Sequence, residues 1–225
     1  MAEKTEKKSG GSKLSAFLEK NKKIVLIVFI AVVILVAGFV CVELVKSSST
    51  KKDLAAIEAY YYDLMEVSVD TEDSEVNKLA TECIENLASY TKKGGIAGVR
   101  ANMLSAELAY ILADYDATVN YYDAAISKGK KSYTAPLCMF NKAVALEELN
   151  KLDEAAQAYK DAADFPDFGM ASHAYFSYGR VLETKGDFAG AAEAYKAMND
   201  KFTDDEWAYV AKTRLIELQT QGKIE

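Results

Sequence analysis

The sequence predicts an all-α protein in which one transmembrane helix precedes a solenoid of helical hairpins with a C-terminal capping helix. Its 225 residues include only two prolines, whereas sandwiches and barrels need many turn residues. A run of 19 residues near the N-terminus carries no charge. The second half of the chain repeats one pattern three times, which is typical of helical solenoids.

The uncharged run covers residues 24–42 and is long enough to cross a bilayer. A helix rises ~1.5 Å per residue, so the run would reach about 28 Å, close to the thickness of the hydrocarbon core. A helix buried in a globular core is rarely apolar on every side for this length. The run is also longer than a signal-peptide core, and no A-x-A site follows it. We therefore predict a transmembrane helix over residues 24–45.

Charges on either side of the run predict its orientation. Residues 1–23 hold seven Lys and three Glu, a net charge of +4. The 20 residues after the run contain only three basic residues, Lys46, Lys51 and Lys52. The positive-inside rule then makes 1–23 a cytoplasmic basic tail. The expected location is the inner (cytoplasmic) membrane, with one span and an extracytoplasmic C-terminal domain.

Cys41 leaves a second kind of anchor open. It lies at the end of the apolar run, where lipid attachment would make the chain a lipoprotein. Val40 is bulkier than the small residue that normally precedes a lipidated cysteine. In the other interpretation, Cys41 is simply an apolar member of the span.

Three segments align at intervals of 37 and then 36 residues: 113–126, 150–163 and 186–199. Each has a small or short residue followed four positions later by a tyrosine. These pairs are Thr118 and Tyr122, Ala155 and Tyr159, and Ala191 and Tyr195. A small residue lets two helix backbones approach closely, and the ring fills the neighbouring gap. The repeated segment therefore predicts a helical hairpin.

This pattern resembles the tetratricopeptide repeat (TPR), a 34-residue helical hairpin with a small residue and an aromatic between its helices. Gly179, Gly186 and Phe188 also fit the motif in the third segment. The first segment departs from it, since Ala113 stands in place of the turn glycine. The resemblance implies three TPR-like repeats over 99–203.

The flanking residues predict further helices, a linker with a divergent helical hairpin over 46–98 and a capping helix over 204–225. Asp53 is expected to cap a helix over 53–67. A second helix is expected over 75–92, before the breakers Gly94 and Gly95. At the other end, Thr203 to Glu206 has the spacing of a capping box.

No residue pattern predicts catalysis, a cofactor or a metal. The only histidine, His173, has no Cys or His cluster near it, and metal sites and nucleophile–base pairs need more. The Gly-rich stretch 94–98 lacks the strand and the GK[ST] of a phosphate loop. Residues 24–225 carry a net charge of −11, which disfavours nucleic acid as a partner. Cys83 and Cys138 are expected to be buried thiols, and a disulfide in an oxidising compartment stays open.

The TPR resemblance implies that the first helix of each repeat lines a groove for partner proteins. The implied groove residues are Arg100, Met103, Glu107 and Tyr110, then Phe140, Val144 and Glu147, and finally His173, Phe176, Arg180 and Glu183. Apolar residues with charges at the edges suit a peptide or helix with apolar anchors. Alternatively, the apolar members pack against the hairpin over 53–92 or against a second copy in a homo-oligomer.

The layout of tail, span and exported repeats also resembles the bacterial YfgM type, an accessory subunit of the protein-export translocon. The resemblance implies a protein-interaction scaffold in the envelope, whose partners are translocon subunits or exported chains. The rival function is a TPR lipoprotein acting in outer-membrane or envelope assembly, which requires lipid on Cys41.

Overall fold

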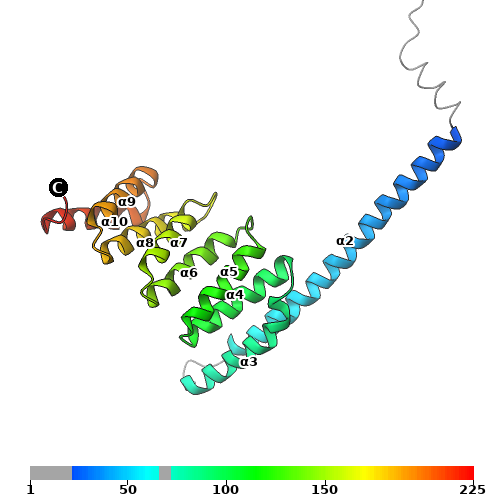
Figure 1. The fold of residues 1–225 in the computed structure, drawn as a ribbon, viewed down its shortest axis with the longest axis horizontal. Coiled ribbons are helices and arrows are strands. Elements are labelled where there is room, and N and C mark those ends of the chain that lie inside the picture. Colours follow the sequence, from blue (N-terminus) through cyan, green and yellow to red (C-terminus); the bar gives the residue numbers. More distant parts are fainter. Residues whose placement is uncertain (1–21, 66–71) are drawn as a thin grey trace, which may run out of the picture. The chain divides into compact units, whose positions relative to one another are not determined.

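The computed structural model describes residues 22–65 and 72–225, with the side chains of 22–34, 37, 40–42, 63 and 65 excepted. These residues form nine α-helices and no strand (Figure 1). The helices are α2 (Lys22–Met65), α3 (Asp73–Thr91), α4 (Gly95–Ile111), α5 (Tyr115–Lys128), α6 (Ala135–Glu148), α7 (Leu152–Ala163), α8 (Ala171–Thr184), α9 (Phe188–Lys201) and α10 (Glu206–Thr220). The predicted all-α class is confirmed.

The chain divides into two compact units, 1–51 and 52–225. The described part of the first unit is the beginning of α2. The second unit contains the end of α2 and all of α3 to α10. Residues 1–21, most of the predicted cytoplasmic tail, lie outside the described residues.

Helix α2 is unbroken from Lys22 to Met65, so the predicted separate helix beginning at Asp53 is wrong. No Pro or Gly occurs between residues 43 and 65, and Ser or Thr costs a helix only about 0.5 kcal/mol per residue. Residues 47–52, which belong to the predicted linker, are therefore helical. Asp53 does not cap a helix, because it lies inside α2, where the backbone amides are already bonded within the helix. Its carboxylate instead pairs with Lys93 Nζ at 2.6 Å.

Helix α2 also contains the whole segment predicted to span the membrane. Among the described residues, which leave out most side chains of the apolar run, no helix is both long and apolar enough to cross a bilayer.

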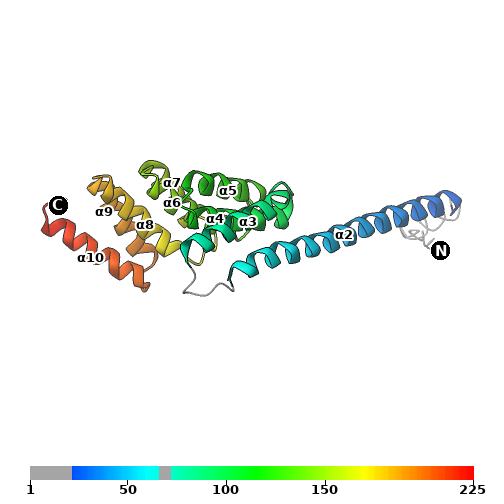
Figure 2. The same cartoon turned by 90° about the horizontal axis from the view of Figure 1, so that it is seen from below.

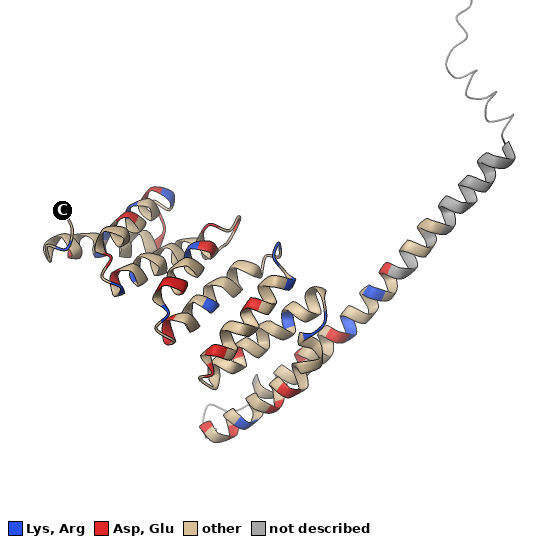
Figure 3. Ribbon diagram, viewed as in Figure 1, with Lys and Arg blue, Asp and Glu red and all other residues tan. Residues whose placement is uncertain are grey.

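Helices α3 to α10 pack mainly on their neighbours in the sequence, and α10 also contacts α8 (Figures 1 and 2). Each contact is short-range in the chain, so the unit is a solenoid of successive hairpins rather than a bundle around one centre. Lys and Arg are scattered among Asp and Glu over the described helices (Figure 3).

The repeated small residue and tyrosine lie in the core, as predicted. Thr118, Ala155 and Ala191 are fully buried, and the three tyrosines are at most 3% exposed. Gly179 shows how close the helices come, since a Cβ added there would collide with the ring of Tyr195. The tyrosine thus occupies space that any larger residue would need.

Each repeat closes its first helix with a residue in the left-handed backbone region. These residues are Ala113 (φ 55°), Asn150 (φ 55°) and Gly186 (φ 82°). In each case the next amide donates to the carbonyl five residues earlier, at 2.8–2.9 Å, as in a Schellman motif. The turn is therefore kept in the first repeat even though the sequence supplies Ala instead of Gly.

Two predicted helix starts are each wrong by two residues. Helix α10 begins at Glu206, and its N-cap is Asp205, whose carboxylate accepts from the Trp207 amide at 2.9 Å. The predicted capping box at Thr203 does not form, because the extended backbone at Asp205 places that carboxylate beside the first free amides. Helix α3 begins at Asp73 instead of residue 75, without a side-chain cap.

We predict that Ala113→Gly stabilises the protein. A left-handed conformation costs a non-glycine residue about 1–2 kcal/mol, and glycine avoids this cost. Glycine also loses more conformational entropy on folding, which offsets about 0.5–1 kcal/mol of the gain. The expected net gain is about 0.5–1 kcal/mol in urea unfolding. Asn150→Gly is the control with a smaller effect, since Asn tolerates this conformation. A loss of stability in Ala113→Gly would contradict the strained turn.

Candidate functional site on the inner face

The implied groove residues lie on α4, α6 and α8, the first helices of the three repeats. Spacings of three and four residues place those of each helix on one stripe. We call the surface that carries them the inner face. It consists of residues 100, 103, 107 and 110 of α4, 140, 144 and 147 of α6, and 173, 176, 180 and 183 of α8.

Ion pairs join neighbouring helices along the inner face. Glu147 of α6 holds Arg180 of α8 in a bidentate pair, with N–O distances of 2.6 and 2.8 Å. Glu183 of α8 holds Arg214 of α10 in the same manner. The two pairs thus join α6 to α8 and α8 to α10, the helices that follow one another along the inner face. We call this series the ladder.

A third bidentate pair joins α2 to α4. Arg100 contacts Glu58 through Nε at 2.6 Å and a terminal nitrogen at 2.9 Å. The hydrogen bond from Arg100 lowers the pKa of the Glu58 carboxyl. Only Arg100 of this pair is a groove residue that the sequence implies, because Glu58 lies in a helix predicted outside the repeats.

The C-terminal end of the inner face is filled by aromatic packing within the chain. His173 stacks on Trp207 with ring centroids 3.9 Å apart, and the tilted ring of Phe140 also packs against His173, with centroids 4.9 Å apart. Phe176 lies between Tyr195 and Trp207. Burial lowers the pKa of His173, so the ring is neutral at neutral pH. Helix α10 covers this end because it brings Trp207 onto α8.

The ladder is interrupted between α4 and α6. At the repeat intervals of 36 and 37 residues, Val144 occupies the position of Arg180, and Tyr110 occupies the position of Glu147. An ion pair equivalent to Glu147–Arg180 therefore cannot form between α4 and α6. A cavity of about 330 Å³ lies at this junction. We call it the tyrosine pocket, and it is lined by Tyr61, Glu107, Tyr110, Ile111, Tyr122, Asn141 and Val144.

Glu107 is the charged group of the tyrosine pocket. Its carboxylate accepts a hydrogen bond from Tyr61 at 3.3 Å. Burial raises the pKa of this carboxyl, and nearby Arg100 opposes the rise only in part. Arg100 is held by Glu58, and among the described residues no Lys or Arg forms an ion pair with Glu107. The carboxylate is thus half-buried without a cation.

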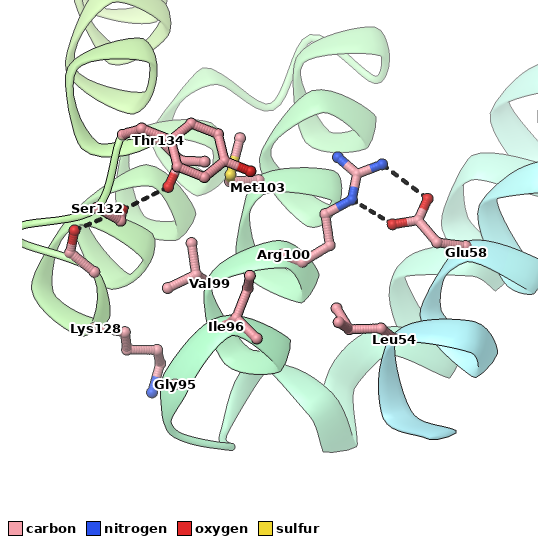
Figure 4. Close-up of a pocket in the computed structure, with 12 residues that line it drawn as sticks. Leu54, Glu58, Gly95, Ile96, Val99, Arg100, Met103, Lys128, Ser132 and Thr134 are labelled. Carbon is pink, nitrogen blue, oxygen red and sulfur yellow. Dashed lines mark hydrogen bonds and ion pairs between the residues drawn. The ribbon is translucent and has the colours of Figure 1, made fainter. Parts of the chain in front are cut away.

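A larger hollow lies beside α4, between the end of α2 and the loop that joins α5 to α6 (Figure 4). Its volume is about 630 Å³, and we call it the apolar pocket. Leu54, Val99 and Met103 line it, and the Arg100–Glu58 pair lies at one edge. Ile96 and Tyr133 also line it, and they are 53% and 83% exposed.

The loop at 129–134 forms one wall of the apolar pocket, and Ser132 and Thr134 are hydrogen bonded there at 2.7 Å. No residue of this wall is among the groove residues that the sequence implies. The available signal was the interval of 37 residues after the first repeat, which exceeds the usual 34 and predicts a longer linker.

Neither cysteine nor carboxylate clusters suggest chemistry in the described part of the chain. Cys83 and Cys138 are buried in separate core clusters, on α3 and α6. Burial raises the pKa of the Cys138 thiol to about 12. No group of three or more His, Cys, Asp or Glu among the described residues could hold a metal ion.

We predict that Arg180→Met lowers the free energy of unfolding by about 1–2 kcal/mol, because it leaves Glu147 partly buried without its charged donor. Lys151→Met is the control, since the Lys151–Asp116 pair is largely exposed, and it should cost under about 0.5 kcal/mol. Urea unfolding of both variants gives the comparison. Equal losses would show that the ladder contributes no more than a surface pair.

Glu107→Gln should stabilise the protein at neutral pH. A carboxyl whose pKa is higher in the folded than in the unfolded chain loses stability as the pH rises between the two values. Gln removes that loss, so the gain should shrink as the pH falls below 4.5, the ordinary pKa of the group.

The matched control is Glu58→Gln, because the pKa of Glu58 is lowered. Its stabilising charge is present at neutral pH and disappears on acidification, so this variant should lose stability at neutral pH and approach the parent in acid. Thermal unfolding at neutral pH and below pH 4.5 tests whether each variant gains or loses stability as expected. Shifts of the same sign in both variants would contradict the description of the tyrosine pocket.

Comparison with known proteins agrees with this geometry. A family model described as tetratricopeptide repeat matches residues 103–169 and 167–206. A TPR repeat-containing protein of Treponema pallidum (strain Nichols) is 28% identical over 139 residues, which is 62% of this chain. The match spans 58% of the length of that relative.

Two solved structures have a similar fold. One holds the nearly identical TPR-like repeats of a Podosopora anserina protein described as a kinesin light chain. It has a TM-score of 0.56 and 10% identity over 77% of this chain and 89% of that one. The other is the apo form of RapI, with a TM-score of 0.51 and 14% identity over 75% of this chain and 50% of that one. Residues 103–206 therefore match tetratricopeptide repeats, and the fold is a TPR-like helical solenoid.

Proposed function

We propose that this chain is a membrane-anchored TPR scaffold of the bacterial envelope, which holds partner polypeptides on its inner face. The observation that carries the binding role is the apolar pocket, about 630 Å³ in volume and lined by side chains of α2, α4 and the 129–134 loop. A hollow of this size with an apolar lining suits the anchor side chain of a bound segment.

The residues around the apolar pocket favour an amphipathic segment. Leu54, Val99 and Met103 supply apolar contact, whereas the Arg100–Glu58 pair and Lys128 supply polar groups at the edge. An apolar anchor with polar neighbours matches this arrangement. The rest of the inner face, toward α10, is already packed by Trp207 and its aromatic neighbours. Binding is therefore assigned to the α4 end.

The proposed anchor is the beginning of α2. Residues 24–42 are uncharged, and α2 is helical throughout them, which gives about 28 Å of apolar helix at ~1.5 Å per residue. The net charge of +4 on residues 1–23 favours a cytoplasmic N-terminus. This orientation supports a single-pass protein of the inner membrane with its repeats outside the cytoplasm, close to the export machinery and its substrates.

The binding proposal is tested by photo-crosslinking the full-length protein in membranes. A photo-reactive residue at Ile96 or Tyr133, both exposed beside the apolar pocket, should yield adducts with translocon subunits or exported chains. The same residue at Glu154, exposed on α7, is the control and should yield none. Adducts from Glu154 alone, or only adducts between copies of this chain, would overturn the assignment.

Mass spectrometry of the membrane-extracted protein tests the anchor. An intact N-terminus without lipid supports the proposed span. A chain that begins at Cys41 and carries lipid would replace it by the lipoprotein of outer-membrane or envelope assembly.

A further inference from the structure

The two pockets lie along one stripe of α4. Met103 lines the apolar pocket, and Glu107 and Tyr110 line the tyrosine pocket. Glu107 and Tyr110 lie four and seven positions after Met103, so the two pockets are about 6–10 Å apart along the helix. A single bound segment can therefore reach both.

The tyrosine pocket has the chemistry of a receptor for a cation. Tyr61, Tyr110 and Tyr122 line the pocket, and aromatic faces attract ammonium and guanidinium groups. The guanidinium of Arg100 already lies over the Tyr61 ring, 5.9 Å from its centroid, which shows that one of these rings accepts a cation. Glu107 contributes a carboxylate, which forms its strongest hydrogen bonds with charged donors. Asn141 adds a neutral polar group.

The charges around this pocket are not balanced within the described chain. Glu148 lies close by and accepts a hydrogen bond from Tyr110 at 3.4 Å. Arg100 acts on Glu107 electrostatically, but its ion pair is with Glu58, and Arg180 is paired with Glu147. Among the described residues, neither Glu107 nor Glu148 forms an ion pair with a Lys or Arg.

The position of the pocket in the ladder points to the same conclusion. On α8, Arg180 reaches back to a glutamate of the preceding first helix. The equivalent position on α6 is Val144, and the cavity opens beside it. A guanidinium lies between α6 and α8 and between α8 and α10, whereas a cavity beside Glu107 lies between α4 and α6.

We propose that the tyrosine pocket receives one lysine or arginine side chain of a bound polypeptide whose apolar anchor sits in the apolar pocket. The inference rests on the proposed scaffold function and adds the chemistry of the partner. At ~3.3 Å per residue, an extended ligand would place the cation about two or three residues from the anchor. A helical ligand would place it one or two turns away.

The electrostatics of Glu107 support the proposal. Burial raises its pKa, which means that the ionised carboxylate is poorly solvated when the pocket is empty. A bound cation would offset this cost, so part of the binding free energy comes from stabilising a charge that has no ion pair among the described residues.

The test uses the full-length protein in detergent micelles and short labelled peptides with blocked ends. Each peptide has one Phe and, three residues later, Lys, norleucine or Glu. Fluorescence anisotropy should give about tenfold tighter binding of the Lys peptide than of the norleucine peptide, as one charge-assisted hydrogen bond supplies. The Glu peptide should bind most weakly.

Glu107→Gln should abolish the preference for Lys over norleucine while the norleucine peptide binds as before. Glu154→Gln on α7 is the matched control and should keep the preference. Tyr110→Leu is a second variant, which removes a ring instead of the charge and should reduce the preference. Thermal unfolding checks that each variant is folded.

The outcomes separate this inference from the proposed function. Equal binding of the Lys and norleucine peptides by the parent protein, or an unchanged preference in Glu107→Gln, would overturn the cation site. Peptide binding that weakens in Ile96→Asp would then still support the scaffold. If no peptide binds, both proposals fail. Competition by phosphatidylethanolamine vesicles against the Lys peptide would overturn the polypeptide as ligand in favour of a lipid amine.

Discussion

The close approach of helices at the repeated small residue and tyrosine is the contact on which the rest of the structure depends. Ala155 and Ala191 are fully buried, and Tyr159 and Tyr195 fill the space beside them. Because each hairpin is closed by this contact, successive hairpins stack at a constant offset. That offset brings α4, α6, α8 and α10 into one layer, where Glu147 can reach a side chain from the next repeat.

The same layer explains why the inner face differs between its two ends. Toward the C-terminus the ladder is complete, and Trp207 of α10 covers the aromatic residues of α8. At the α4–α6 junction the ladder lacks its charges, and two pockets remain beside α4. A solenoid transmits little strain between distant repeats, so a departure in one repeat changes the surface there without disturbing the others. The divergent first repeat is therefore the part best placed for binding.

Half of the candidate site could be recognised from the sequence, because the TPR resemblance implies Met103, Glu107 and Tyr110 as groove residues. Their spacing places them on one stripe of a helix. The other half could not, since it comes from residues far apart in the chain. Glu58 and Tyr61 enter from α2, and the 129–134 loop closes the apolar pocket. Spacing along the chain does not say which side chains from other helices will neutralise or cover a stripe.

The sequence by itself determined the helical class, the three hairpins and their buried residues, because these follow from local periodicity and from a motif repeated within about 36 residues. Tertiary structure decided the rest. It showed α2 to be one helix, since Ser and Lys neither favour nor forbid a break. It also assigned Arg100 and Arg180 to ion pairs within the chain, whereas Glu107 has none among the residues that the structure describes. Charge pairing depends on distances between helices, and those distances are set only when the hairpins stack.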